Sequence, residues 1–161
     1  MAESPRILTL EHIWERCMMG KVITLAEYKR LGWMQRGVLP VFCCMPSEEV
    51  QPVLLNQRLA KLLQDLPASK RRYKVKSCLE NVLRDLPEHS LLGRFDVLFH
   101  PNYRVDVLAA FVQLAKSHPM ALLWPGSVDA DNLTYAEPGY LDYHTYRIKD
   151  YDIVCIVEDA L

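Results

Sequence analysis

Apolar residues along this chain fall into continuous runs of strand length and into stripes with helical spacing. Continuous runs cover residues 38–44, 119–124 and 153–157, and such runs are typical of strands buried on both faces of a parallel sheet. Residues 95–99 predict a further strand that could begin as early as Leu91. Strands therefore alternate with helices, which predicts an α/β fold with three layers, a mostly parallel sheet flanked by helices.

Two helices are predicted in the first part of the chain. Thr24 and Glu27 have the spacing of a capping box, in which each side chain satisfies a free amide of the first turn. The helix that follows should stop near Gly32 or Gly37. Its inward face should consist of Leu25, Tyr28 and Leu31. A second helix is indicated by a stripe of leucines that ends at Pro67, formed by Leu55, Leu59, Leu62, Leu63 and Leu66.

Two more helices are predicted after a basic segment at residues 70–76, which has the composition of a mobile link. Ser77 and Glu80 have the spacing of another capping box, and the helix behind them should end at Pro87. The apolar side of that helix consists of Cys78, Leu79, Val82, Leu83 and Leu86. Asn102 is expected to cap the last helix, whose apolar residues are Val105, Leu108, Phe111, Val112 and Ala115.

The length of 161 residues suits a single α/β domain that spans residues 1–161, and half of the residues are apolar. A formal net charge of −1 gives no global reason to expect binding to nucleic acid or to an anionic membrane, so only a local patch could provide it. No apolar run approaches the roughly 18 residues that span a bilayer, and residues 1–9 lack the features of a secretory signal. We therefore expect no membrane partner and a cytoplasmic location.

The cysteines and histidines show no spacing typical of a metal site or of a disulfide framework. The five cysteines are odd in number and contain no CxxC motif; they are Cys17, Cys43, Cys44, Cys78 and Cys155. We expect them to be reduced, buried thiols, which also favours a cytoplasmic location. The histidines are scattered at positions 12, 89, 100, 118 and 144, and none lies beside a cysteine at metal-ligand spacing. No metal is expected.

Several motifs in the second half of the chain form a specific series. Leu-Trp-Pro-Gly at 123–126 is followed by Leu-Thr-Tyr-Ala-Glu-Pro-Gly at 133–139 and by an Asp-Tyr pair at 142–143. Upstream, Asp-Val-Leu-Phe-His-Pro at 96–101 precedes an amphipathic helix. From about Leu54 to Tyr146 this series resembles the BrxF family, the small P-loop proteins of type 3 bacteriophage-exclusion (BREX) systems.

The resemblance implies a P-loop-NTPase-like α/β fold and a place in an anti-phage defence system. In that family the small protein accompanies a large ATPase, a DNA methyltransferase and a PglZ-like protein with a phosphatase fold. These defence-system proteins are therefore the expected partners. Relatives of the family resemble ring-forming ATPases, so a homo-oligomer is a further expectation.

The motif that holds phosphate in such folds is missing after the first apolar run. A P-loop requires G-x-x-x-x-G-K-[ST], in which glycines let backbone amides wrap the phosphates and lysine neutralises their charge. Residues 45–52 are Met-Pro-Ser-Glu-Glu-Val-Gln-Pro, with two prolines, two carboxylates and no glycine. Loss of the lysine and of each amide bond costs ~1.5–3 kcal/mol, and the sum is comparable to a micromolar affinity of about 8 kcal/mol. We expect a P-loop-like scaffold without the P-loop, no nucleotide cofactor and no catalysis.

Two other features of nucleotide-binding sites are incomplete. The one Gly-Lys pair, Gly20-Lys21, follows a helix-like segment and lacks the upstream glycine of a P-loop. Asp96 is the acid nearest to a strand end that could hold magnesium. Gly93 stands where the BrxF family has an aspartate, and glycine cannot ligate a metal through its side chain. Both features argue against an ATPase.

The basic segment supports an alternative function, a DNA- or nucleotide-binding accessory subunit. Its basic residues are Lys70, Arg71, Arg72, Lys74 and Lys76. They could contact nucleic-acid phosphates or an acidic partner, or they could simply face solvent. Tyr73 is the one aromatic residue among them, so stacking on bases has little support from the sequence.

Aromatic residues near the end of the chain predict a protein contact face, because tyrosine is enriched in interface cores. The candidates are Trp124, Tyr135, Tyr140, Tyr143 and Tyr146. Alternatively, the tyrosine rings cover an edge of the sheet, and Trp124 either lines a vestigial pocket or, as we favour, packs in the core. A third hypothesis is a small enzyme whose site contains Glu137, Asp142 and His144. We favour a non-catalytic adaptor or structural component of a BREX-like complex.

Overall fold

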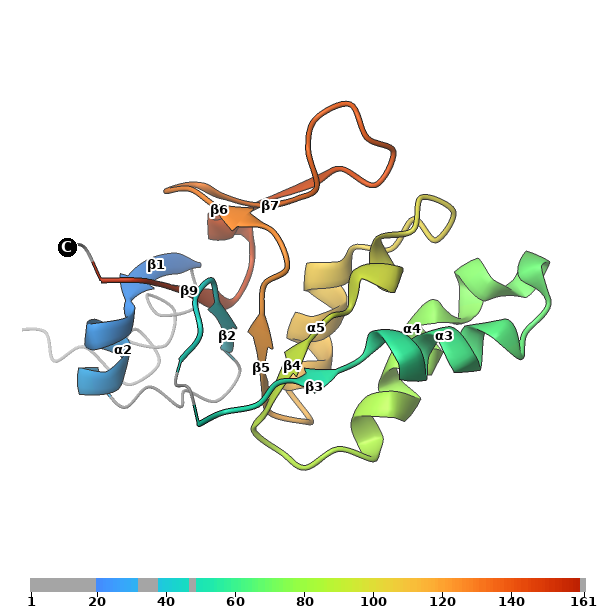
Figure 1. Cartoon of the computed structure of the whole chain (residues 1–161), viewed down its shortest axis with the longest axis horizontal. Helices are drawn as coiled ribbons and strands as arrows, with labels where there is room; N and C mark the ends of the chain where they lie inside the picture. Colours follow the sequence, from blue (N-terminus) through green and yellow to red (C-terminus); the bar gives the residue numbers. More distant parts are fainter. Residues whose placement is uncertain (1–19, 32–37, 47–48, 160–161) are drawn as a thin grey trace, which may run out of the picture.

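The computed structural model describes residues 20–31, 38–46 and 49–159, and at its centre is a six-stranded sheet (Figure 1). Neighbouring strands lie in the order β1-β9-β2-β5-β4-β3, and each pair is parallel. The strands are β1 (Lys21–Thr24), β2 (Leu39–Phe42), β3 (Val53–Leu54), β4 (Ser90–Gly93), β5 (Met120–Leu123) and β9 (Ile153–Val157). The predicted α/β fold with a parallel sheet flanked by helices is confirmed.

Helices lie on both faces of this sheet. They are α2 (Leu25–Leu31), α3 (Asn56–Gln64), α4 (Ala68–Arg84) and α5 (Val107–Ala115). On one face, Leu39 and Val41 of β2 join a large core to which α3, α4 and α5 contribute. On the other face, Phe42 packs in a second core with Tyr28 of α2, and their rings meet edge to face. The alternation of β2 side chains between two cores explains its continuous apolar run.

Strand β2 lies inside the sheet although it contains Pro40, which cannot donate to a ladder. The amide of Leu39 donates to the carbonyl of Asp152, on the side of β9. Because successive amides point to opposite sides of a strand, the nitrogen of Pro40 faces β5. Pairing with β5 begins only at Val41, one residue after Pro40, so the proline removes at most one bond at the start of this ladder.

Helix α2 begins where the sequence predicts it. The amide of Glu27 donates to the Thr24 hydroxyl at 3.1 Å, which is the first half of a capping box. The prediction that Leu31 faces inward is wrong, because 48% of this residue is exposed. The expected stop near Gly32 or Gly37 lies outside the described residues.

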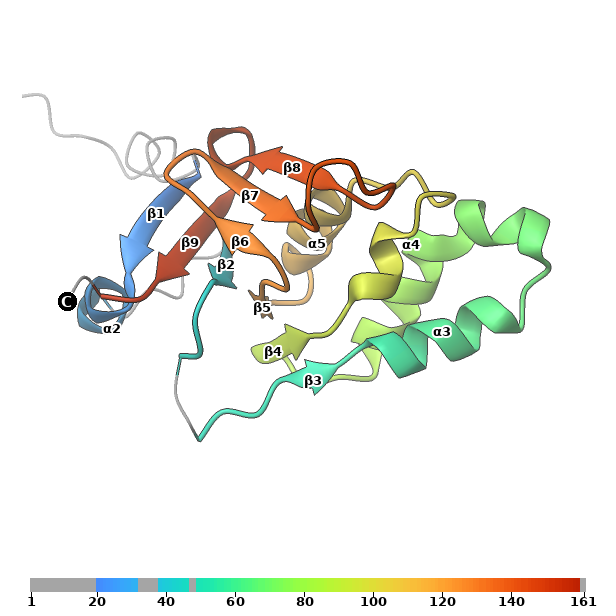
Figure 2. The same ribbon diagram turned by 45° about the horizontal axis from the view of Figure 1, so that its top comes forward.

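The basic segment is part of a helix, so the prediction of a mobile link is wrong. Helix α4 runs unbroken through residues 70–76, and Ser77 lies in its interior instead of at its N-cap. The segment has strong helix formers and no glycine or proline between Pro67 and Pro87. Val75 is buried and extends the predicted apolar side of the helix by one turn. In Figures 1 and 2 the antiparallel pair α3 and α4 extends beyond the β3 edge of the sheet.

The region around Phe95 also differs from the prediction. Strand β4 ends at Gly93, and residues 96–99 form a single 3-10 turn instead of a strand. Arg94, whose φ is 46°, adopts a left-handed conformation that ends the strand. The cap of α5 is Asp106, whose carboxylate accepts the amide of Ala109 at 2.9 Å, and not Asn102 as predicted.

A small antiparallel sheet takes the place of a helix in the last crossover, between β5 and β9. Its strands are β6 (Ser127–Val128), β7 (Asn132–Tyr135) and β8 (His144–Arg147), followed by a 3-10 turn at Ile148–Asp150. Figure 2 shows the three strands side by side. The loop of residues 136–143 between β7 and β8 rises away from the remaining chain in Figure 1.

Among the residues that the model describes, no helix combines the length and the apolar character required to cross a membrane.

Candidate functional site

The carboxyl edge of a parallel sheet is the usual place for a ligand in α/β folds. After β2, residues 43–46 and 49–52 form no helix and lead to β3. Ser47 and Glu48, which belong to the acidic segment that replaces a P-loop, lie outside the described residues. The amide of Cys43 is used in pairing, since it donates to the carbonyl of Ile156 at 2.8 Å. The described part of this connection therefore shows neither the loop nor the helix that would surround a phosphate.

The Gly20-Lys21 pair lies at the wrong end of a strand for a phosphate loop. Lys21 is the first residue of β1, whereas a P-loop lysine follows a strand. Gly20 is buried, and a Cβ atom there would come within 1.8 Å of the Ile148 carbonyl oxygen. Gly20 is thus explained by close packing of the backbone and does not require a ligand.

Asp96 lies at the same carboxyl edge, but protein groups occupy both of its oxygens. Oδ2 accepts the hydroxyl of Tyr135 at 3.1 Å, and Oδ1 accepts Nδ2 of Asn56 at 3.4 Å. Asn56 Oδ1 in turn accepts the amide of Val97 at 3.0 Å. Burial, together with the charge of Asp96 and this hydrogen bond, raises the pKa of Tyr135 to about 12. The arrangement fixes the turn after β4 against the small sheet.

A small notch of about 290 Å³ lies beside Asp96, between the ends of β4 and β5. Its other lining residues are Arg94, Leu123, Trp124 and Pro125. This volume is at the lower limit of ligand pockets, which span roughly 300–1,000 Å³. Gly93 is closed off by Pro52, whose Cβ lies 3.1 Å from the position of an added Cβ. The notch corresponds to the vestigial pocket that the sequence offers for Trp124 as the alternative to core packing, and it combines one arginine, Arg94, with one carboxylate, Asp96.

The structure separates the five aromatic residues predicted as a contact face. Trp124 and Tyr146 are each 5% exposed and belong to the core, so their assignment to a surface is corrected. Tyr135 is half-buried and stacks on Phe99. Tyr140 and Tyr143, by contrast, are exposed in the loop of residues 136–143. The rings of Trp124 and Tyr146 are buried because Phe95, Phe99 and Trp124 form one aromatic cluster under the small sheet.

The sequence interpretation missed Leu141, which is 87% exposed at the tip of the same loop. Tyr140, at 65% exposure, stands beside it. The loop is held by short-range bonds, since the amide of Tyr140 donates to the Glu137 carbonyl and that of Tyr143 to the Tyr140 carbonyl. The sequence did contain a signal for this exposed apolar residue: a leucine between two tyrosines in a turn that contains proline and glycine.

The three residues of the hypothetical catalytic site do not form an acid–base arrangement. Nδ1 of His144 lies 2.7 Å from the main-chain carbonyl of Asp142, so this nitrogen carries the proton and the Asp142 carboxylate does not orient it through this bond. The ring packs against Tyr146 and Phe99. Glu137 is exposed in the loop. The local packing explains His144 without catalysis.

Cysteines and acidic residues provide no metal site in the described part of the chain. Cys78 and Cys155 are buried thiols as predicted, whereas Cys43 and Cys44 are only partly buried, and all four are unpaired. A hydrogen bond between the Cys43 and Cys155 thiols lowers the pKa of Cys43 and raises that of Cys155. Cys17 lies outside the described residues.

The basic residues of α4 point in different directions. Arg71 turns toward α3, where its Nε donates to the carbonyls of Leu63 and Leu66 at 2.8 and 3.1 Å. Arg72 and Lys76, four residues apart, share one flank of the helix. On that flank Lys76 Nζ donates to Gln113 of α5 at 2.6 Å. Lys70 and Lys74 share another flank, about 200° around the helix. One continuous patch of five basic residues is therefore not formed.

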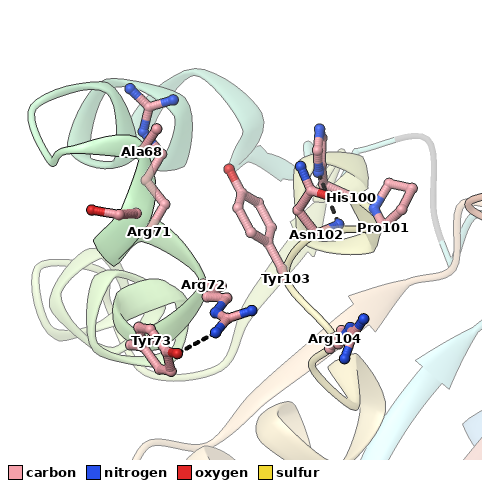
Figure 3. Close-up of a pocket in the computed structure, with 10 residues that line it drawn as sticks. Ala68, Arg71, Arg72, Tyr73, His100, Pro101, Asn102, Tyr103 and Arg104 are labelled. Carbon is pink, nitrogen blue, oxygen red and sulfur yellow. Dashed lines mark hydrogen bonds between the residues drawn. The ribbon is translucent and has the colours of Figure 1, made fainter.

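A groove of about 680 Å³ lies between the start of α4 and the loop of residues 100–104 (Figure 3). Arg71, Arg72 and Tyr73 line it from α4, and His100, Tyr103 and Arg104 line it from the loop. No aspartate or glutamate is among the described residues that line it. The loop side of this groove could not be inferred from the basic segment alone, because the two sides are about 30 residues apart in sequence.

Comparison of the chain with protein-family models, with curated proteins and with solved structures found no match.

Proposed function

We propose that this protein is a non-catalytic adaptor of a bacterial anti-phage defence complex of the BREX type, built on a degenerate P-loop NTPase-like scaffold. The observation that carries the proposal is the course of the chain after β2. A P-loop protein continues from this strand into a glycine loop and a helix whose N-terminus binds phosphate. Here the described residues of the connection lead to β3 without a helix, and Pro46 and Pro52 remove amide donors from it.

The order of the strands supports the scaffold. If β2, β3, β4, β5 and β9 are numbered 1 to 5 in chain order, they lie along the sheet in the order 5-1-4-3-2. Strand β2 lies in the middle of the sheet, between β9 and β5, and the chain leaves it for β3 at the far edge. A phosphate loop follows a strand of this kind, at the carboxyl edge where α/β folds bind ligands. The likeness of the motifs at 123–126 and 133–139 to the BrxF family supports the same origin.

The loop of residues 136–143 supports a role in binding another protein. Tyr140 and Leu141 expose large apolar side chains on a segment that projects from the molecule (Figure 1). Buried aromatic and aliphatic anchors provide most of the binding energy in protein interfaces. The loop carries Glu137 and Asp142 beside them, which would provide a polar rim. We propose that this loop contacts the large ATPase, the methyltransferase or the PglZ-like protein of the system.

The alternative, a nucleic-acid-binding subunit that uses all of residues 70–76, has less support. Arg71 is engaged by α3 and Lys76 by Gln113. The remaining Lys70, Arg72 and Lys74 do not share one face of α4.

Co-purification from the native host tests the adaptor. A tagged protein should retain one of the defence-system proteins after nuclease treatment, which removes partners bridged by nucleic acid. Leu141→Ser and Tyr140→Ser should each reduce the retained partner at least about tenfold, as expected for an interface anchor. Tyr73→Ser is the matched control, since Tyr73 is 68% exposed on α4, and it should leave retention unchanged.

A second measurement tests the absence of catalysis. Purified protein mixed with ATP and Mg²⁺ should release no phosphate above the rate of a buffer blank, and titration calorimetry should show no binding heat. Hydrolysis that survives further purification would contradict the proposal, as would retention of every partner by the Leu141→Ser and Tyr140→Ser variants.

A further inference from the structure

The groove between α4 and the loop of residues 100–104 has a one-sided charge. Arg72 and Arg104 are both exposed, and neither forms an ion pair with a described residue. Within the described chain, the hydrogen bond and the cation–π interaction of Arg72 are both with Tyr73. An arginine without a carboxylate partner is free to bind an anion, and it binds phosphate in a bidentate manner.

The backbone around the groove favours the same kind of ligand. Helix α4 has 17 residues and begins at Ala68 without a side-chain cap or an acidic residue in its first turn. The positive end of its dipole therefore lies beside the groove, which Ala68 and Ser69 line. Arg104 is held with a φ of 47°, a conformation that costs about 1 kcal/mol or more outside glycine. Arg104 is among the residues that line the groove (Figure 3).

Aromatic rings lie beside these cations. Tyr73 is 68% exposed, and the guanidinium of Arg72 covers one face of its ring at 4.6 Å. Across the groove, the rings of His100 and Tyr103 lie 5.0 Å apart and 36° from parallel. His100 is held in place because its Nδ1 accepts the amide of Asn102 at 3.2 Å. The groove therefore combines phosphate-binding cations with rings on both sides.

We propose that this groove binds a single-stranded segment of nucleic acid. Arg72 and Arg104 bind backbone phosphates, and unpaired bases stack on Tyr73 and on the pair of His100 and Tyr103. Proteins that bind single strands combine these two elements, a positive groove and aromatic platforms. A base in a duplex has no free face to stack, and the carboxylate side chains of an acidic peptide offer no ring to Tyr73. The volume of about 680 Å³ suits one or two nucleotides of a longer strand.

Fluorescence anisotropy of the full chain with a labelled 20-nucleotide DNA strand of mixed sequence, and with the RNA of the same sequence, tests the proposal. Binding should be measurable at about 50 mM salt and should weaken as salt rises, by roughly 0.7 in the logarithmic slope for each phosphate contact. The double change Arg72→Ala and Arg104→Ala should weaken binding at least about tenfold and reduce the slope by roughly 1.4. Both side chains are exposed, so their removal should not disturb the core. Alanine at position 104 keeps the Cβ atom, so the backbone there stays as restricted as with arginine.

Two further variants separate this site from unspecific attraction. Tyr73→Leu should weaken binding about tenfold and leave the salt slope unchanged, because it removes stacking and no charge. The double change Lys70→Ala and Lys74→Ala removes the same charge from another flank of α4 and should change the affinity less than about twofold. Circular dichroism of each variant checks that the fold is intact.

Several outcomes would overturn the proposal: no binding at about 50 mM salt, equal losses from the lysine and arginine pairs, or no loss from Tyr73→Leu. Equal affinity for duplex DNA, for a poly-glutamate peptide or for ATP alone would replace it with a different ligand. The result is independent of the adaptor role, because Arg72, Tyr73 and Arg104 lie outside the loop of residues 136–143. A failure of either proposal leaves the other standing.

Discussion

The ring of Tyr135 lies flat against the ring of Phe99, with the two centroids 3.8 Å apart and the planes within 9° of parallel. Tyr135 ends β7 of the small antiparallel sheet, and Phe99 ends the 3-10 turn that follows β4. The hydroxyl of Tyr135 also reaches Asp96 in that turn. A single side chain therefore connects the small sheet to the large one by stacking and by a hydrogen bond.

This relationship predicts different effects for two substitutions of Tyr135. Tyr135→Phe keeps the stacked ring and leaves Asp96 without one donor, so the free energy of unfolding should fall by about 1 kcal/mol. Tyr135→Ala also removes the ring and should lower it by about 3 kcal/mol. Urea unfolding followed by circular dichroism measures both values. Equal losses from the two variants would show that the stack contributes nothing.

Arg71 lines the groove, but its hydrogen bonds to the end of α3 predict an effect on stability. Its Nε donates to the carbonyl of Leu63 in the last turn of α3 and to that of Leu66 just beyond the helix end. Arg71→Ala should lower the free energy of unfolding by about 1.5 kcal/mol, the lower value for a hydrogen bond from a charged group. Arg71→Lys should recover little of it, because an ammonium lacks the fixed geometry of Nε.

The control for Arg71 is its neighbour in sequence. Lys70→Ala removes the same charge from the same turn of α4, but Lys70 is exposed and should change stability by less than about 0.5 kcal/mol. Thermal unfolding of the three variants with the parent protein distinguishes the two roles. A loss from Lys70→Ala as large as that from Arg71→Ala would indicate a general effect of charge on the helix.

Much of the central sheet could be predicted because its strands are buried on both faces. The apolar runs at residues 38–44, 119–124 and 153–157 gave β2, β5 and β9 their positions. Strands β1 and β3 lie at the edges of the sheet and lack such runs, because β1 begins with Lys21 and ends with Thr24, and β3 has only two residues. Burial on two faces leaves a continuous signal in the sequence, whereas an edge strand of two residues leaves almost none.

Other errors arose where one apolar pattern fits two conformations. Phe95, Leu98 and Phe99 are buried in a 3-10 turn, but the same residues satisfy a short strand. The left-handed φ of Arg94 ends the strand before the 3-10 turn, and an arginine in the sequence gives no sign of such a conformation. In α4, the dense charge of residues 70–76 concealed Val75, the buried residue that continues the apolar side of the helix.

The candidate sites were only partly accessible to sequence analysis because they depend on long-range contacts. Tyr140 and Tyr143 are exposed as a contact face requires, but Trp124 and Tyr146 are covered by rings from distant segments. Likewise, Arg72 and Tyr73 gain His100 and Tyr103 as neighbours across the groove only through the packing of α4 beside the loop before α5.

Alkaline pH should destabilise the fold through its tyrosines. Burial, and next the charge and hydrogen bond of Asp96, raises the pKa of Tyr135 from 10.0 to about 12. Burial first, and then Asp106, also raises the pKa values of Tyr146 and Tyr151. A group whose pKa is higher in the folded state stabilises that state below its unfolded pKa, and this contribution disappears as the pH rises through the folded pKa.

The expected result is a free energy of unfolding that receives the full tyrosine contribution below pH 10 and loses the part from Tyr135 between pH 10 and about 12. Urea titrations at a series of pH values measure it. Ultraviolet absorbance should show part of the tyrosinate forming later in the folded protein than in the same chain in denaturant. Identical absorbance titrations in the two states would contradict the prediction.

Tyr146→Phe is predicted to stabilise the protein. The hydroxyl of Tyr146 is buried and has no hydrogen-bond partner in the described structure, a situation that costs roughly 1–3 kcal/mol. Phenylalanine keeps the ring against Trp124 and removes this oxygen, so the free energy of unfolding should rise by about 1 kcal/mol.

Tyr151→Phe is the matched control, because the ring of Tyr151 lies 6.0 Å from that of Tyr146. The hydroxyl of Tyr151 donates to Asp106 at 2.8 Å, so this substitution should lower the free energy of unfolding by about 1 kcal/mol. Urea unfolding of both variants should therefore give changes of opposite sign, and a loss of stability from Tyr146→Phe would show that its hydroxyl is bonded, with the nearby backbone of Val107 as the partner.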